Sequence, residues 1–323
     1  MSIINLVMVS TLFLLIIVPS TNLALTERDF SSQDYALTRF LIESIERYSY
    51  VSRKDLPRSD DVAQAFINEF SGTGVSISWW RDYLAWQEDW WTDEAGGDNF
   101  ILNYHLVIFI GHRHYGGNIY FGRFADRPGR PHTDYVDFTG WVNAANAPEV
   151  HPYWRTKWIV LASCETLKDD NAWNPDYPAY QIASVTFNGR RNNIWDWNDM
   201  YLHVMVGMYT DFLQEDGLDI DYASPTLQSF AVNLKNGYTI KNTWFRAVED
   251  HQRVCYGSFC TWVGRAAAMS PFIKVYNQNG ELVASYYYSD ETLYSIYQRP
   301  IDLVNYYLQQ GYNVVLGWVY YHQ

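Results

Sequence analysis

Basic residues are scarce in this chain and nowhere clustered. The 323 residues include 23 Lys and Arg against 36 Asp and Glu, which gives a formal net charge of −13. A chain this acidic repels polyanions, which argues against nucleic acid and anionic membrane surfaces as partners. Two signatures of catalysis are also missing from the sequence, a glycine-rich phosphate-binding loop and the Gly-x-Ser-x-Gly turn of serine hydrolases.

Long apolar stretches are equally few. Residues 3–18 form one, and no second stretch of this kind follows. Its length of 16 residues is short for a membrane-spanning helix and matches the apolar core of a signal peptide. We therefore predict a signal peptide over residues 1–24 and a secreted chain from residue 25 onward. An uncleaved N-terminal anchor is the alternative, and it alone would make the membrane a partner.

Cysteine occurs only three times, at Cys164, Cys255 and Cys260. In an oxidising compartment an odd number leaves one thiol unpaired. The short segment between Cys255 and Cys260 contains Gly257, which lets a tight loop close. We predict a disulfide between these two cysteines and a free thiol at Cys164.

Aromatic residues, by contrast, are abundant, with 14 Trp and 27 Tyr. Hydrophobic residues make up 48% of the chain and charged residues 18%, a composition that fills a sizeable core. We find no internal repeat and no low-complexity linker, so we predict a single domain over residues 25–323. Aromatic surfaces also bind sugars and proteins, so a glycan or another surface partner is a second expectation.

Apolar runs and turn signals predict alternating strands and helices. Residues 36–50 fit either structure. The expected strands are Leu106–Ile110, Trp158–Ala162, residues 203–208 and residues 314–321. The expected helices are one capped by Asp60 or Asp61 and ended by residues 71–74, one capped by Ser224 and ending at Lys235, one opened by Thr239, and residues 301–309. A hairpin of residues 272–276 and 282–288, turning at Asn279-Gly280, begins a hairpin and helix elaboration over residues 271–323.

Four aromatic residues, Trp79, Tyr83, Trp86 and Trp90, recur at the spacing of one helix face. We predict a helix there whose aromatic side is packed in the core, with a ligand-binding platform as the alternative.

Two of the predicted strands end in residues with reactive side chains. Gly111-His112 follows the first strand, and Ser163-Cys164 follows the second. Strands interleaved with helices predict an α/β fold with a mostly parallel sheet, whose site lies at the carboxyl ends of the strands. An imidazole beside a thiol raises the thiolate fraction and later protonates the leaving group. We therefore expect His112 and Cys164 to meet at one edge of the sheet.

This arrangement resembles the caspase/gingipain/legumain superfamily of cysteine peptidases. The likeness rests on a strand ending in Gly-His with glycines after it, followed about 50 residues later by a strand ending in Ser-Cys. It covers residues 100–170, and residues 195–250 resemble secreted domains related to that superfamily. The resemblance implies a caspase-like three-layer α/β/α sandwich, with His112 as general base and Cys164 as nucleophile. It also implies oxyanion or positioning roles for Gly111, or a residue after it, and for Gly116.

The sequence departs from that pattern beside both residues. Arg113 stands where a glycine is expected after the histidine, and Glu165 follows the cysteine. An inward-pointing Glu165 would oppose formation of the thiolate. Other interpretations of the same residues remain open: Cys164 as a small buried residue, His112 as a turn residue, or His114 as the working histidine. A zinc site at His112 and His114 lacks further ligands at a suitable spacing, and His203 fits a buried core position.

Acidic clusters offer a weaker candidate. Asp216, Asp219 and Asp221 are spaced as oxygen ligands for calcium, but the loop lacks the full EF-hand pattern and its terminal Glu, so a solvated acidic turn is the better explanation. A second acidic patch is interpreted as solvated surface; it contains Glu88, Asp89, Asp93, Glu94 and Asp98.

Two functions follow from these patterns. The first is a secreted cysteine peptidase-like hydrolase that acts on peptide or amide bonds of a peptide or protein substrate and needs no cofactor. The second is a catalytically inactive extracellular binding or surface protein on the same fold, with an aromatic-rich contact face. The distance between the His112 ring and the Cys164 sulfur, with their exposure, separates the two.

Overall fold

A computed structural model provides the fold. It describes residues 39–48, 55–85, 87–90, 101, 104–113, 119, 121, 156–168, 190–191, 194–195, 204–214, 220–256, 258–295 and 300–323. Several predictions lie outside these residues: the signal peptide, Trp86, His114, Gly116, His203, Asp216 and Asp219. No helix in the described ranges is long and apolar enough to cross a membrane.

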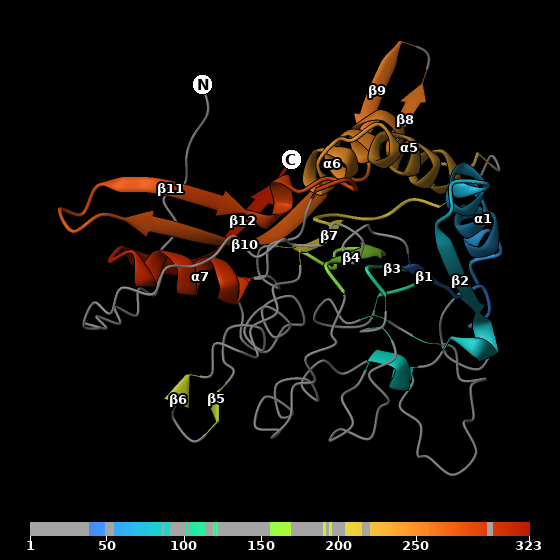
Figure 1. Cartoon of the computed structure of the whole chain (residues 1–323). Coiled ribbons are helices and arrows are strands. Elements are labelled where there is room, and N and C mark those ends of the chain that lie inside the picture. Colours follow the sequence, from blue (N-terminus) through green and yellow to red (C-terminus); the bar gives the residue numbers. More distant parts are fainter. Residues whose placement is uncertain are drawn as a thin grey trace.

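An eight-stranded mixed sheet forms the centre of the molecule (Figure 1). Its strands follow one another as β2-β1-β3-β4-β7-β10, with β11 and β12 both paired to β10. The first five run parallel, and β10 lies antiparallel to its three neighbours. The bounds are β1 Arg39–Ser44, β2 Ser76–Arg81, β3 Leu106–Ile110, β4 Trp158–Ala162, β7 Val204–Met208, β10 Ala266–Tyr276, β11 Leu282–Tyr287 and β12 Asn313–His322.

The predicted central strands are confirmed. The bounds of β3 and β4 are those expected, and β7 covers the expected run from Val204 onward. All residues of these three strands are buried, which explains their continuous apolar sequences, because a central parallel strand is covered on both faces. The undecided segment contains strand β1, whose buried residues pair with β2 and β3.

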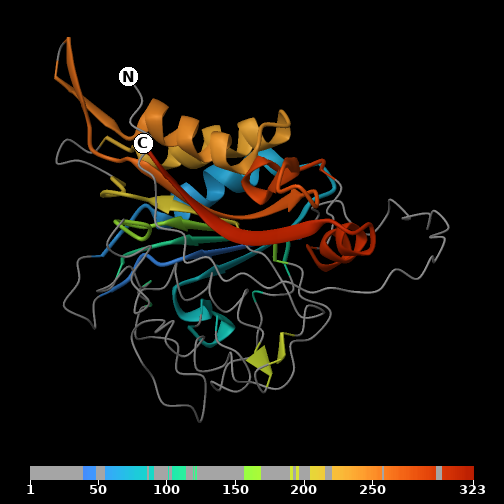
Figure 2. The ribbon, with the colours of Figure 1, turned by 90° about the vertical axis from the view of Figure 1, so that its left-hand side faces the viewer.

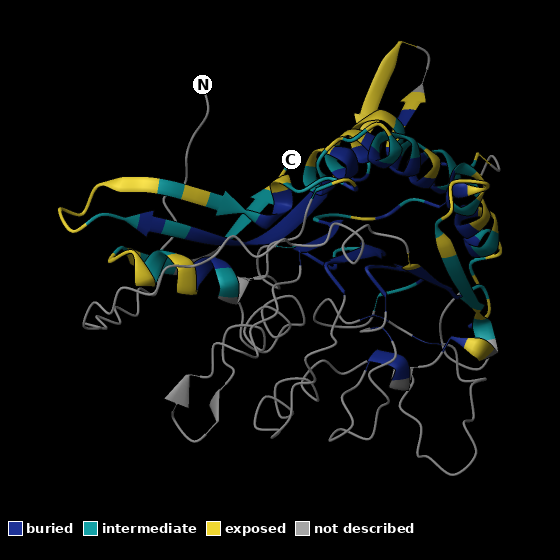
Figure 3. Ribbon diagram, in the orientation of Figure 1, coloured by how far each residue is buried: buried dark blue, intermediate teal, exposed yellow. Residues whose placement is uncertain are grey.

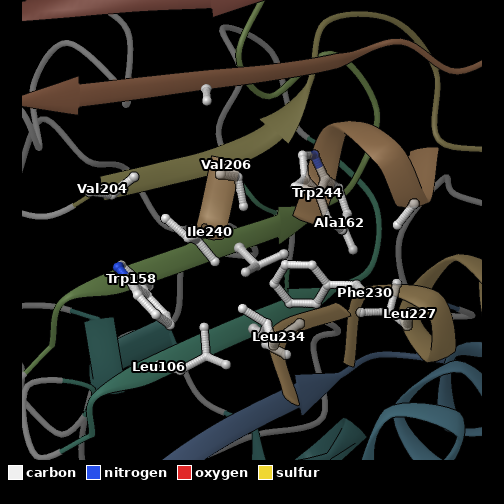
Figure 4. Close-up of a cluster of buried hydrophobic side chains, with 14 of the residues drawn as sticks. Leu106, Trp158, Ala162, Val204, Val206, Leu227, Phe230, Leu234, Ile240 and Trp244 are labelled. Atoms are coloured by element: carbon white, nitrogen blue, oxygen red, sulfur yellow. The ribbon is translucent and has the colours of Figure 1, made fainter. Parts of the chain in front are cut away.

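Helices α1 Ser59–Phe70, α5 Ala223–Lys235 and α6 Ile240–His251 cover one face of the sheet (Figure 2). Their apolar sides and one face of the strands form a single buried cluster, in which Phe230 packs edge-on against Trp244 at 5.5 Å (Figure 4). The Trp244 indole donates to the carbonyl of Gly207 on β7 at 2.7 Å and so fastens α6 to the sheet.

The helix starts confirm one predicted cap and correct two. Thr239 caps α6 as expected, because its hydroxyl accepts the N–H of Asn242. Helix α1 has no side-chain cap, so neither Asp60 nor Asp61 plays that part. In α5 the Ser224 N–H donates to the Asp221 carboxylate, so the capping oxygen comes from the preceding loop.

The predicted aromatic helix is wrong. Trp79 lies in strand β2, which is followed by two short 3-10 helices, η1 Asp82–Leu84 and η2 Gln87–Trp90. The four aromatic residues have a helical spacing only by coincidence. The backbone of residues 76–81 pairs with β1 instead and therefore forms a strand. Asp82 also ends the strand in a left-handed conformation, with φ at 43°.

The opposite face of the sheet carries a second buried cluster, which includes Tyr48, Trp90, Phe109 and Phe121. Trp90 is wholly buried there, and its indole donates to the Glu43 carboxylate. Asp89 is buried as well, with 1% of its surface exposed, so the prediction that it belongs to a solvated acidic patch is wrong.

The C-terminal part extends the sheet beyond the helix layer, as Figure 1 shows. Strand β10 begins earlier than the predicted hairpin, and α7 Pro300–Gln309 and β12 match the predicted helix and strand. Pro271 lies in β10 but disrupts its pairing with neither β7 nor β11. The pairing of β10 with β7 extends only as far as Met269, and its pairing with β11 starts at Phe272. A proline is tolerated there since its missing N–H falls in the gap between those two partners.

A separate hairpin stands above α5 and α6 (Figures 1 and 3). It consists of β8 Arg253–Tyr256 and β9 Phe259–Trp262, which pair only with each other among the described strands. All of β9 is exposed. The predicted Cys255–Cys260 disulfide is present between directly opposed positions of the two strands, and Cys164 is the free cysteine.

Candidate functional site

The carboxyl edge of the parallel strands contains the candidate site. From β1 the chain moves outward to β2 and then crosses to β3 on the other side of β1, so the direction of winding changes between β1 and β3. Ligands of open α/β sheets bind outside the carboxyl ends of the strands at such a switch point. His112 follows β3 at this point, and Cys164 follows the adjacent β4.

The register of β3 and β4 relates His112 to Cys164. Ile110 and Ala162, the last residues of the two strands, are direct partners. His112 lies two residues beyond the first, and Cys164 lies two residues beyond the second. Adjacent strands are about 4.8 Å apart, so the two loops leave the sheet side by side at the same level.

Tyr48 holds the loop that carries His112. The His112 backbone N–H donates to the Tyr48 hydroxyl at 2.9 Å, and the two rings lie 4.7 Å apart. Gly111 is buried at the same contact, where a Cβ would lie 2.6 Å from the Tyr48 hydroxyl oxygen and 2.8 Å from the Phe109 ring. Glycine is therefore required at this position by packing, a role separate from the oxyanion or positioning role that the family resemblance implies.

Cys164 is half-buried and bonded to the loop after β7. Its sulfur accepts the Phe212 N–H at 3.4 Å, and its S–H donates to the Phe212 carbonyl at 3.8 Å. Burial raises the pKa of the Cys164 thiol, while the Phe212 N–H and the charge of Arg113 act to lower it and Asp211 and Glu165 act to raise it. Desolvation is the largest effect, so the resting thiol is protonated at neutral pH.

The two residues that depart from the family pattern pair with each other. The Arg113 guanidinium contacts the Glu165 carboxylate, and the Lys168 ammonium contacts the other carboxylate oxygen of Glu165 at 3.0 Å. All three side chains are partly exposed. Glu165 also has a left-handed backbone, with φ at 46°, and its N–H donates to the Thr210 carbonyl at 2.7 Å. The loop after Cys164 is therefore fixed on both sides, by Arg113 after β3 and by Thr210 after β7.

A polar network on β1 and β2 borders the site and was not predicted from the sequence. The Ser44 hydroxyl donates to Asp60 at 2.7 Å and accepts the Trp79 indole N–H at 2.9 Å. Arg81 bonds the second oxygen of Asp60 at 3.1 Å. Burial and the neighbouring carboxylates Asp60, Asp82 and Asp61 raise the pKa of Glu46. The one sequence signal was a serine at the end of an apolar stretch, which is too common to single out.

The weaker metal candidates gain no support. Asp221 accepts the Ser224 N–H and lies 3.8 Å from Arg58, so it serves the start of α5. The other two acids of the calcium prediction, Asp216 and Asp219, are outside the described ranges. Within those ranges no three His, Cys, Asp or Glu side chains gather as a metal would require.

Comparison with known proteins assigns the chain to a family. No curated protein sequence matches it. A family model described as a domain of unknown function, DUF6345, matches residues 42–279, which is well over half of the chain. The matched part begins within β1 and ends in the turn after β10, so it includes both His112 and Cys164. The chain therefore belongs to the DUF6345 family.

Proposed function

We propose that this chain is a secreted hydrolase of peptide or amide bonds, with Cys164 as nucleophile and His112 as general base. One observation carries the proposal: each residue lies two positions along the chain beyond a register partner, at the ends of adjacent parallel strands and beside the switch point of the sheet. This is where open α/β proteins bind their ligands, and a thiol and an imidazole are the groups that amide hydrolysis uses.

The protonated resting thiol fits a reaction in which substrate triggers proton transfer. His112 takes the S–H proton of Cys164 as the sulfur attacks the substrate carbonyl carbon. The protonated imidazole then gives that proton to the leaving amine, and the C–N bond breaks to leave a thioester. Water, deprotonated by His112, attacks the thioester carbonyl, the C–S bond breaks to release the acid, and the protonated His112 returns the proton to the leaving thiolate.

Two backbone donors near the dyad are already engaged. The His112 N–H bonds the Tyr48 hydroxyl and the Glu165 N–H bonds the Thr210 carbonyl, so neither is open to a substrate oxyanion in this state. We propose that the oxyanion is bound by the backbone N–H of Cys164 and by donors that substrate binding brings into place.

A caspase-like three-layer architecture is the finer proposal for the fold. The mostly parallel sheet, the helix layer on one face and the second buried cluster on the other face support it.

Export is proposed from the apolar segment at residues 3–18, and the Cys255–Cys260 disulfide agrees with an oxidising compartment. N-terminal sequencing of protein recovered from medium should start near residue 25, whereas an intact Met1 in the membrane fraction contradicts cleavage.

A second candidate function, a non-catalytic binding protein, is favoured by a separate observation. The Cys164 sulfur makes hydrogen bonds in both directions with the Phe212 backbone, as a purely structural cysteine would. Phe259 and Trp262, both on β9, are exposed and would provide a contact surface for a glycan or a protein.

Thiol labelling and turnover distinguish these functions. We expect iodoacetamide to label Cys164 in the native chain without denaturant but slowly, because the resting thiol is protonated, and a fluorogenic peptide library to contain cleaved members. Cys164→Ala and His112→Ala should each abolish turnover, and the double variant should lose little more, because the pair acts as a unit. His251→Ala, a histidine on α6, is the matched control and should keep activity. Labelling that requires denaturant, with no peptide cleaved, would rule out the hydrolase and leave the binding protein.

A further inference from the structure

Strand β12 lies at one edge of the sheet that the described strands form. It pairs with β10 along its whole length, from Asn313 opposite Tyr276 to His322 opposite Ala267. Among the described strands it has no second partner. Figure 2 shows β12 running across the side of the molecule that faces the viewer.

The hydrogen-bond pattern shows which backbone groups point outward. The Gln323 N–H bonds the Ala266 carbonyl, so that pair is hydrogen-bonded, and bonding alternates along an antiparallel ladder. The N–H and C=O groups of every second residue of β12 therefore point away from β10. These residues are Val314, Leu316, Trp318, Tyr320 and His322.

The composition of this edge is unusual for the chain. Residues 300–323, which form α7 and β12, contain one acidic side chain, Asp302, and no Lys or Arg, although the whole chain carries a net charge of −13. Monomeric proteins protect long edge strands with charged residues, proline or bulges, and β12 has no charged residue and no proline. The same segment is rich in Tyr, and Tyr306 on α7, a helix packed against β12, is half exposed. Few charges and many aromatic residues are typical of the core of a protein interface.

We propose that β12 pairs antiparallel with β12 of a second copy of this chain, which joins two sheets into one across a two-fold axis. Antiparallel pairing makes the edge complementary to itself, and the contact closes after two chains. Two acidic chains also repel each other least where they carry fewest carboxylates, which favours a second copy at this edge. The inference does not depend on the proposed hydrolase.

Sedimentation equilibrium of the purified chain over a concentration series tests the proposal. We expect a monomer–dimer equilibrium, and amide exchange over residues 313–323 should slow as the concentration rises. The Val314 side chain packs partly against the buried cluster beneath the helices, so folding of each variant is checked first. Val314→Lys places a charge at the edge strand, and Val314→Pro removes one outward N–H without touching the β10 ladder. Each should raise the dimer dissociation constant about tenfold or more. Val283→Lys, the same change on exposed β11, is the matched control and should leave dimerisation unchanged.

Several results would overturn the proposal. The wild-type chain could remain a monomer at every concentration, or its exchange over residues 313–323 could be independent of concentration. Dimerisation that persists in a folded Val314→Pro variant would place the interface elsewhere. If circular dichroism shows that either variant fails to fold, the two wild-type measurements decide.

Discussion

Arg113 and Glu165 form an ion pair that joins the residue after His112 to the residue after Cys164. The two side chains come from loops that follow the adjacent parallel strands β3 and β4. In the sequence both residues counted against a working site, one as a bulky cation and the other as an anion beside the thiol. In the structure they neutralise each other, with Lys168 as a second partner of Glu165, and tie the two candidate catalytic loops together.

The first prediction concerns this ion pair. Arg113→Gln and Glu165→Gln should each lower the free energy of unfolding by only about 0.5–1 kcal/mol, because the pair is partly exposed. Each should reduce turnover by about tenfold to a hundredfold, since a loop shift of about 1 Å misplaces the reacting groups. The double variant should resemble either single variant in both measurements. Additive losses would show that the two side chains act separately, and Lys168→Gln is the control for removing one charge nearby.

The second prediction concerns the contact between Gly111 and Tyr48. Gly111→Ala places a Cβ within 2.6 Å of the Tyr48 hydroxyl, so we expect a loss of about 1–3 kcal/mol in urea unfolding. Tyr48→Phe alone should cost about 1 kcal/mol, because the His112 N–H loses its acceptor. The combined variant should be more stable than the sum of the two losses predicts, since removing the hydroxyl relieves the shorter of the two clashes and leaves only the contact with the Phe109 ring. If the two losses in unfolding free energy simply add, the contact with the Tyr48 hydroxyl is not the reason for a glycine at position 111.

The third prediction concerns the β8–β9 hairpin. Its strands pair only with each other in the described fold, and an isolated two-stranded hairpin is marginally stable in water. Replacing both Cys255 and Cys260 by serine should therefore increase amide exchange in the hairpin while leaving the unfolding midpoint of the sheet nearly unchanged. Hydrogen exchange with peptide resolution measures both effects. A large fall in the global midpoint would show that the hairpin contributes to the core.

The fourth prediction is a pH dependence that comes from Lys157 and Glu291. Burial, opposed by the charge of its partner, lowers the pKa of Lys157 to about 8 and raises the pKa of Glu291 to about 7. Between pH 4.5 and about 7, Glu291 makes the folded chain bind more protons than the unfolded chain. Between pH about 8 and 10.5, Lys157 makes the folded chain bind fewer protons than the unfolded chain. Stability should fall across the first window and rise across the second, with a minimum between them.

Urea unfolding at a series of pH values measures this minimum. The double variant Lys157→Met with Glu291→Gln should flatten it, because both titrating groups are gone. Lys241→Met with Asp290→Asn removes a neighbouring ion pair in which Asp290 is 54% exposed, and it should leave the minimum in place. A profile that is unchanged in the first double variant would mean that other groups determine the pH dependence.

Local sequence signals were reliable where one short segment determines its own structure. Strands β3 and β4 were predicted with their observed ends, because continuous apolar runs of that length fit a strand covered on both faces. The Thr239 cap and the Asn279-Gly280 turn depend on the chemistry of one or two residues and were also confirmed. The helix predicted from Trp79 to Trp90 failed because aromatic residues such as Trp79 also suit a strand, and pairing with the distant β1 made residues 76–81 a strand.

By itself, then, the sequence determined the alternation of strands and helices, the cysteine pair and the two strands that end in His112 and Cys164. Tertiary structure alone decided what surrounds those residues: the Tyr48 hydroxyl against Gly111, the Phe212 backbone on the thiol and the partner of Arg113. The reason is physical. Capping, turns and burial patterns act over a few residues of chain, whereas these contacts join segments about 50 or more residues apart in sequence, and their geometry exists only after the sheet has set the order and register of its strands.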